Sequence, residues 1–332
     1  MADHSLPHSL PRVLLQVLRA CLAAIAGLPL AAAAQADYPV RPLTLVVGFA
    51  PGGPNDIQGR LIARALAARL GQPVEVVNRA GGSGNPATES VARAAPDGYT
   101  LLLLGPANAI NASLFAHLPF DFRRDIVPVA GITREALVLV VHPSVPAHDV
   151  AGFIGYARQA RPTIASTGNG SAPHVSALLF NRSTGLDLPI EHFAGGGPAL
   201  QDLVAGGRTQ LMFEPMSASV EPVKAGRLRA LAVTSTGPSA ALPGVPPLAA
   251  TLPGYEASAV TGIGVPRGTP QAIVDRLNRE VNAALADPAV RPLFTDSGGE
   301  PLAGTPAEFA QTVRGEIDKW AVVVKAAGAR AD

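Results

Sequence analysis

The sequence predicts an α/β protein built from mostly parallel sheets flanked by helices. Continuous apolar segments such as 43–49 and 99–104 are typical of strands buried on both faces, and amphipathic segments such as 57–70 separate them. The 34 glycines and 32 prolines predict short elements with frequent turns. This alternation indicates parallel sheets that are covered by helices on both sides.

The alternating elements form two series along the chain. In the first we expect strands at 43–49, 74–78, 99–104, 129–133 and 137–142, with helices at 57–70, 87–94, 108–115 and 150–160. In the second we expect strands at 163–166, 189–193, 210–213 and 229–234, with helices at 174–184, 199–205 and 218–224.

A connection and a helical tail follow the second series. Residues 237–254 are rich in Pro, Ala and Gly and predict an extended segment. Two helices are predicted at 270–286 and 306–326, where Thr-Pro pairs supply a Thr N-cap and a Pro at the first helical position. If the tail packs back on the first series, the chain crosses between two lobes near 137–142 and 257–265. The predicted lobes are then 37–137 plus 257–332, and 138–256 including the connection.

Residues 1–36 are predicted to be a signal peptide. Arg12 and Arg19 precede a Leu/Ala/Val-rich stretch that ends in small residues, with cleavage expected near Ala34–Ala36. The alternative is a membrane anchor, but Arg19 leaves an apolar run shorter than the ~20 residues that a span needs. The mature chain then has a formal net charge of zero and no cysteine, and we expect it to be exported.

The composition excludes several classes of protein. Charged residues make up 15% of the chain, against a usual quarter or so. The sequence has no cluster of basic residues, which argues against a nucleic-acid-binding protein. A hydrophobic content of 48% is incompatible with disorder, and a single cysteine cannot form a disulfide scaffold within the chain.

Four predicted strands end in loops rich in Gly, Asn or Ser that lead into helices. The carboxyl ends of strands form the ligand crevice of open α/β sheets, and helix N-termini offer free N–H donors to anions. For any one loop the alternative is an ordinary turn in which Asp56 or Ser171 only caps a helix. Several such ends together predict a site that holds a carboxylate without Arg or Lys. The loops are 50–56, 105–108, 166–171 and 194–199.

Signatures of enzymes are absent from the sequence. There is no Gly-x-Ser-x-Gly elbow and no phosphate loop, and the histidines lack metal-ligand spacing. His174 opens a helix beside the third loop, where a helix-start residue is favoured over a catalytic base. Glu214 follows the strand at 210–213, and it either faces the cleft or caps the next helix. We therefore expect no catalytic residue, no metal and no cofactor.

Seven stretches of residues 38–332 resemble the Bug family, exported receptors of tripartite tricarboxylate transporters related to TctC. They are YPVRPLTLVVGFAPGGPNDIQGRLIA (38–63), VEVVNRAGGSGNPATESVARAAPDGYTLLL (74–103), ASTGNGSAPHVSALLF (165–180), GGGPALQDLVAGGRTQLMF (195–213), VKAGRLRALAVTS (223–235), LPGYEASAVTGIGVPRGTPQAIVDRLN (252–278) and GTPAEFAQTVRGEIDKW (304–320).

The resemblance implies a monomeric, two-lobed periplasmic binding protein of the Venus flytrap type that closes on a small carboxylate and delivers it to a membrane permease. Organic acids, acidic amino acids and aromatic acids are all compatible ligands. By motif, the ligand-binding residues are Ala50, Pro51, Gly52, Gly53, Asn55, Asp56, Asn108, Ser166, Thr167, Asn169, Ser171, His174, Gly195, Gly196, Gly197, Pro198 and Ala199, with Glu214 as a further candidate.

Two positions depart from the family pattern. Relatives often carry Tyr-Lys-Gly in the fourth loop, where this chain has His192-Phe193-Ala194-Gly195 without the lysine. The strand that often ends in Phe-Asp ends here in Phe213-Glu214. Both departures bear on the ligand more than on the fold. Two other functions stay open: a sensor that docks a two-component membrane kinase, and an exported enzyme that uses Asp56, His174 and Glu214.

Overall fold

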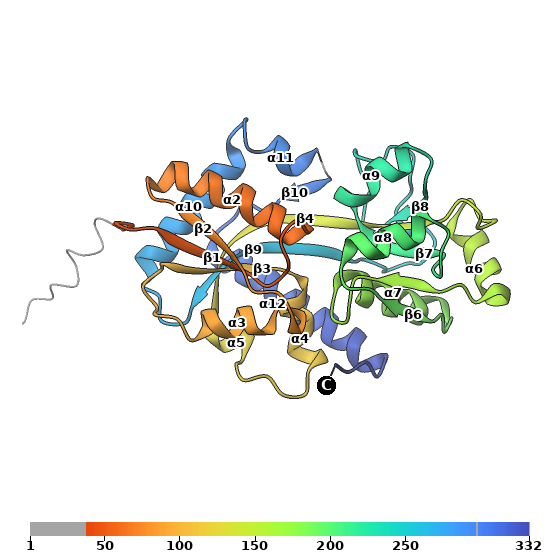
Figure 1. Ribbon diagram of the computed structural model, residues 1–332, viewed down its shortest axis with the longest axis horizontal. Coiled ribbons are helices and arrows are strands. Elements are labelled where there is room, and N and C mark those ends of the chain that lie inside the picture. Colours follow the sequence, from red (N-terminus) through yellow and green to blue (C-terminus); the bar gives the residue numbers. More distant parts are fainter. Residues whose placement is uncertain (1–37, 297, 332) are drawn as a thin grey trace, which may run out of the picture. The chain divides into compact units, whose positions relative to one another are not determined.

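The computed structural model describes residues 38–296 and 298–331, in which two sheets share one long strand (Figure 1). The predicted signal peptide, 1–36, lies outside the described residues. Within the described ranges, no helix combines the length and apolar character that crossing a bilayer requires.

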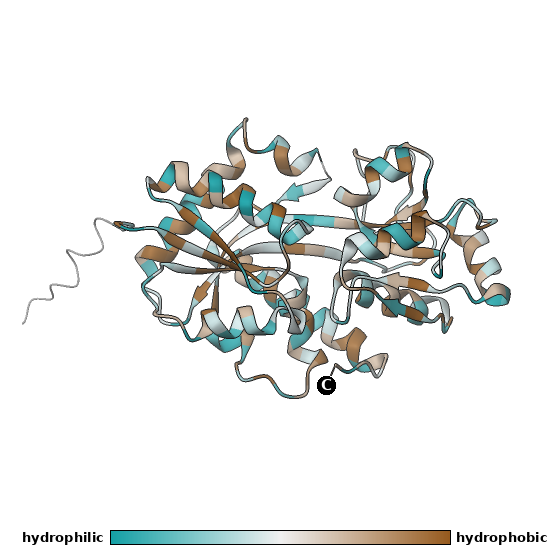
Figure 2. Ribbon diagram, viewed as in Figure 1, coloured by the Kyte–Doolittle hydropathy of each residue, from teal (hydrophilic) through white to brown (hydrophobic). Residues whose placement is uncertain are grey.

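The first sheet begins with three parallel strands in the order β2-β1-β3. The sequences LTLVV in β1 and TLLLL in β3 are almost wholly apolar because helices cover both faces of these strands. Figure 2 shows hydrophobic colour concentrated along these strands. The strands are β1 (Leu43–Val47), β2 (Val74–Asn78) and β3 (Thr100–Leu104), and the helices that follow them are α2 (Pro54–Leu70), α3 (Asn85–Ala92) and α4 (Pro106–Leu114).

A single strand, β4 (Ile126–Val141), joins the two sheets. Up to Ala136 it pairs antiparallel with β9 (Ser258–Pro266), and from Leu137 onward it pairs with β7 (Leu211–Pro215) and β8 (Arg229–Val233). The prediction of two separate strands at 129–133 and 137–142 was wrong. Arg134 and Glu135 interrupt the apolar pattern, but both residues continue the backbone ladder with β9 and β10 (Gly299–Pro301). In Figure 1, β4 and β9 run side by side from the half that holds β1 to the half that holds β7.

The second sheet has the order β4-β7-β5-β6, with β8 on the other side of β4. The strands β5, β6 and β7 are parallel to one another. Its core includes the stacked or tilted rings of Phe153, Phe180, Phe213 and Tyr255. The elements are β5 (Ile164–Ser166), β6 (Ile190–His192), β7 (Leu211–Pro215), β8 (Arg229–Val233), α6 (Val150–Ala160), α7 (Ala172–Thr184), α8 (Gly196–Val204) and α9 (Met216–Lys224).

The C-terminal helices pack on the first sheet, as the two-crossing arrangement requires. Helix α10 (Gln271–Ala286) packs against α2 and β4, and α12 (Pro306–Ala326) packs against α4 and β4. Thr305 caps α12 as predicted, in a capping box with Glu308. The predicted cap of α10 was wrong, because Thr269 donates its hydroxyl to the carbonyl of Pro266 instead. Short elements that the sequence did not predict are η2 (Gly82–Gly84), α5 (Phe122–Asp125), η3 (Leu248–Ala250), α11 (Pro292–Thr295) and β10 (Gly299–Pro301).

Candidate functional site

The loop between β1 and α2 carries the first group of predicted ligand-binding residues. Ala50, Pro51 and Gly52 are exposed, and Gly53 precedes the helix without a capping side chain. Gly52 has φ +82°, a left-handed conformation that favours glycine. The loop therefore offers backbone groups and little side chain to a ligand.

Asp56 is buried beneath this loop and fixes its conformation. Its Oδ2 accepts hydrogen bonds from the Gly52 N–H and from Arg60 Nε, both at 2.9 Å, and its Oδ1 accepts one from Asn78 Nδ2 at 2.8 Å. Burial alone would raise the pKa of this carboxyl, but the hydrogen bonds from Arg60, Gly52 and Asn78 lower it below the usual value. Asp56 is thus an ionised support of the loop. The sequence did not single out Asn78, which also donates to the carbonyl of Phe49.

The third strand leads into a loop that Asn108 stabilises. Its Oδ1 accepts from the Gly105 N–H at 2.8 Å, and its Nδ2 donates to Thr88 Oγ1 at 2.8 Å. Asn55 of the first loop lies close by, since a Cβ at Gly105 would be 3.4 Å from Asn55 Oδ1. The first and second loops therefore meet, with Asn108 as a support.

The loop after β5 is stabilised by two serines. Ser171 caps α7 by accepting the His174 N–H, and its hydroxyl donates to the Gly168 carbonyl at 2.7 Å. Ser166 Oγ lies within hydrogen-bond distance of Gly168, Ser171 and His192. Ser171 therefore caps α7, and the loop is held in a defined shape.

His174 is a buried, neutral residue at the start of α7. Its Nδ1 accepts the Gly170 N–H at 3.2 Å, so the ring carries its proton on Nε2. Burial, followed by the charge of His192, lowers the pKa of His174 to about 4. The two imidazoles meet edge to face, with their centroids 4.8 Å apart. The arrangement presents a ring N–H donor near neutral pH.

The fourth loop ends at the N-terminus of α8. Gly195 precedes the helix at φ 114° and no side chain caps it, so the first backbone N–H groups remain available to an anion. Gly197 and Pro198 are exposed, whereas Ala199 is buried in the core. Ala199 therefore contributes to packing, and Gly196 and Gly197 present the helix N-terminus.

Glu214 lies inside β7 and faces the start of α8. A Cβ at Gly196 would lie 3.7 Å from Glu214 Oε1 and 3.9 Å from the side chain of Thr167. Glu214 is 2% exposed, and its Oε2 has no hydrogen-bond partner among the described residues. Burial, and then the neighbouring charge of Glu135, raise the pKa of Glu214 to about 8. This carboxyl is therefore mainly protonated at neutral pH, and it does not cap α9.

Contacts between the two series of elements connect these loops. Ser83 of η2 donates its hydroxyl to the Asn169 carbonyl at 3.0 Å. Gly170 lies against α4, because a Cβ there would be 2.6 Å from Asn111 Oδ1. The sequence missed Ser83 and Asn111, although the GGSG stretch at 81–84 was an available signal. The four predicted loops thus form a connected set that spans both sheets.

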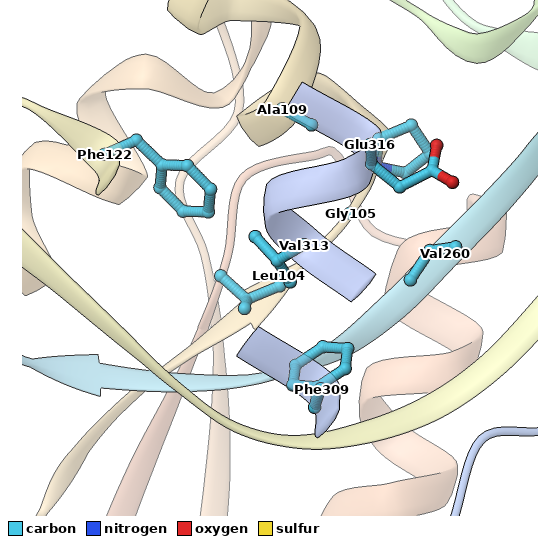
Figure 3. Close-up of a pocket in the computed structure, with 9 residues that line it drawn as sticks. Leu104, Gly105, Ala109, Phe122, Val260, Phe309, Val313 and Glu316 are labelled. Atoms are coloured by element: carbon cyan, nitrogen blue, oxygen red, sulfur yellow. The ribbon is translucent and has the colours of Figure 1, made fainter. Parts of the chain in front are cut away.

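A small recess beside α12 lies apart from most of these residues (Figure 3). Leu104, Phe122, Val260, Phe309 and Val313 line most of it, and its volume of about 20 Å³ leaves room for roughly one water molecule. It cannot hold an organic ligand. Within residues 38–296 and 298–331, no group of three or more His, Cys, Asp or Glu side chains gathers as a metal site.

Two lobes joined by shared strands, with glycine-rich loops from both, define the class of the periplasmic binding proteins. The solved structure of the periplasmic binding protein BugD matches with a TM-score of 0.81 and 28% identity, over 89% of this chain and 100% of BugD. Residues 58–329 match the tripartite tricarboxylate transporter family receptor, TctC, and the chain belongs to that family. The family and the two-lobed fold inferred from the sequence motifs are confirmed.

Further relatives extend the comparison. Protein BugT of Bordetella pertussis is 38% identical over 92% of this chain and 95% of its own length. The structure of R. palustris Rpa4515 with adipate is 38% identical with a TM-score of 0.81, covering 88% of this chain and 98% of that protein. The structure of MatC from Rhodopseudomonas palustris with bound malate is 36% identical with a TM-score of 0.78, covering 86% and 100%.

Proposed function

We propose that this protein is a periplasmic receptor that captures a small organic acid between its lobes and delivers it to a tripartite tricarboxylate-type permease. The observation that carries the proposal is the uncapped N-terminus of α8, which stands beside Thr167 of the loop after β5. None of the residues predicted to line the site is Lys or Arg, so a carboxylate would be held by backbone N–H groups, hydroxyls and the helix dipole. Adipate in Rpa4515 and malate in MatC support this ligand class.

The candidate residues divide into contacting and supporting groups under this proposal. Gly52, Gly53, Thr167, Gly196 and Gly197 would contact the acid through backbone or short side-chain groups. Asp56, Asn108, Ser166 and Ser171 would hold the loops in shape, since their polar atoms already bond within the protein. Closure would take place about β4 and β9, near the predicted crossings at 137–142 and 257–265.

The direct test is a thermal-shift screen of protein freed of bound ligand by unfolding and refolding. Adipate, malate and other mono-, di- and tricarboxylates are compared at the same ionic strength. Binding at a hundredfold excess over Kd should raise the melting temperature by about 5 °C. Absence of stabilisation by every carboxylate would contradict the proposal.

A matched pair of variants locates the site. Gly197 is exposed at the α8 N-terminus, and a Cβ added there would have no atom within 4 Å, so Gly197→Leu should fold normally and obstruct the anion position. Gly155 on α6 is equally exposed and open, so Gly155→Leu is the control. We expect the first variant to lose acid binding and the second to keep it; equal affinities would place the site elsewhere.

The role of the bound acid is tested in cells. A receptor for a permease predicts that deletion of the gene abolishes uptake of the labelled acid while acid-induced transcription persists. A sensor predicts the reverse. An enzyme would convert the acid, and His174→Ala would stop that conversion; binding without turnover supports the receptor.

A further inference from the structure

We propose that Glu214 is a specificity-determining residue, which donates a hydrogen bond to an oxygen atom of the bound acid and thereby rejects ligands that present an ammonium group there. This inference rests on the receptor function proposed above. It adds which chemical group the ligand must place next to Glu214.

The position of Glu214 is the first step. Its Oε1 faces the α8 N-terminus at Gly196, which has no side chain. A Cβ added at Gly196 would lie 3.7 Å from this oxygen and 3.9 Å from Thr167 Cγ2. The residue is 2% exposed, yet Oε2 has no partner in the described part of the chain. A buried polar atom without a partner is costly, so a bound molecule that supplies one gains affinity there.

The charges around Glu214 are the second step. Glu135 of β4 is the charged group that adds to the effect of burial on the pKa of Glu214, and no cation among the described residues offsets this rise. Glu135 itself accepts the Ser217 N–H at 2.7 Å and Gln58 Nε2 at 3.4 Å. Burial raises the pKa of Glu135 too, although the hydrogen bonds from Ser217 oppose the shift.

The state of the carboxyl follows from this environment. Burial beside a second carboxyl places the pKa of Glu214 at about 8, so it carries a proton at neutral pH. His174 and His192 have lowered pKa values and are neutral in the same range. Below pH 8 the group is therefore an O–H donor beside a helix N-terminus that favours anions.

The ligand chemistry is the third step. A carboxylate or hydroxyl oxygen of the acid can accept the Glu214 proton, whereas an ammonium group has only donors to offer. An ammonium would also face the positive end of α8. Because the acid binds the protonated form, its affinity should fall as pH rises through the pKa of Glu214.

The experiment is calorimetry between pH 6.5 and 9.5 with the acid that gives the largest thermal shift, starting with adipate and malate. We expect constant affinity up to pH 7 and a fall approaching tenfold per pH unit above pH 8. Malate should bind at least tenfold more tightly than aspartate at pH 7, since the two differ by hydroxyl against ammonium.

Two variants separate recognition from structural support. Glu214→Gln keeps a donor, so it should bind within a few fold of the original at pH 7 and lose the fall above pH 8. Glu135→Gln removes the like charge, so the fall should begin at a lower pH. If Glu214 had a structural role alone, neither substitution would change how acid affinity depends on pH.

Each result decides the matter. A flat pH profile in the original protein, or aspartate binding more tightly than malate, overturns this inference and leaves the receptor function standing. If no acid binds at any pH, both proposals fall. A fall that persists unchanged in Glu214→Gln also overturns the assignment.

Discussion

Replacement of Glu214 by Gln should change how the stability of the ligand-free protein depends on pH. The folded protein holds the pKa of this carboxyl at about 8, against the ordinary value of 4.5 that applies in the unfolded chain. Below pH 4.5 both states are protonated. As pH rises to 8 only the unfolded state ionises, so the original protein loses stability over this range.

The magnitude follows from the size of the shift. At about 1.4 kcal/mol per pKa unit, the difference between 4.5 and about 8 corresponds to roughly 5 kcal/mol, an upper figure because the folded protein can relax around the charge. Glu214→Gln cannot ionise and avoids this loss. The free energy of unfolding of the variant relative to the original should therefore increase by several kcal/mol between pH 4.5 and 8.5.

The assay is urea unfolding of both proteins at pH 4.5, 6.5 and 8.5, followed by circular dichroism. Glu135→Gln is the comparison, because it lowers the pKa of Glu214 and leaves that carboxyl in place, so it should lose less stability than the original protein over the same pH range. A stability difference between Glu214→Gln and the original that is the same at every pH would refute the reasoning. It would show that Glu214 ionises in the folded protein as readily as in the unfolded chain.

Three further substitutions test the support of the site and the helical tail. Asp56→Ala should cost about 1–3 kcal/mol of unfolding free energy and weaken acid binding at least tenfold, because the β1–α2 loop loses its anchor. Asp187 is exposed, so Asp187→Ala should change neither stability nor affinity in the same urea-unfolding and calorimetry measurements, and equal effects of the two substitutions would contradict the role of Asp56. Gly170→Ala should destabilise the protein by about 1–3 kcal/mol in urea unfolding, because φ is +74° and the new Cβ would meet Asn111 Oδ1 at 2.6 Å; unchanged stability would disprove that close approach. Thr305→Ala should cost about 1 kcal/mol by the same measurement while acid affinity stays constant, and a cost near zero would show that the capping box adds nothing.

Elements with strong local patterns were predictable. The strand at 74–78 and the helices at 150–160 and 306–326 have the predicted bounds, because alternation, apolar spacing and capping are encoded within each segment. The bounds of β4 were not predictable in this way. Arg134 and Glu135 interrupt the apolar pattern, and only pairing with β9 and β10, both more than a hundred residues away in the sequence, keeps them in one strand.

The candidate loops were identifiable from the sequence, but the roles of their residues were not. Asp56 and Asn108 stand in ligand-type motifs, yet their polar atoms bond to the protein. The sequence also left open whether Glu214 faces the cleft or caps a helix. Spacing along a chain does not reveal which hydrogen-bond partners converge from distant segments.

By itself, the sequence determined the α/β class, the family and the four loops at the strand ends, since each follows from short-range pattern and motif. The tertiary structure alone decided that β4 runs unbroken through both sheets, that Asp56 supports a loop, and that Glu214 is buried beside Glu135. Those facts depend on contacts between residues far apart in the chain. Burial and neighbouring charge, which set the protonation of a carboxyl, exist only once the chain is folded.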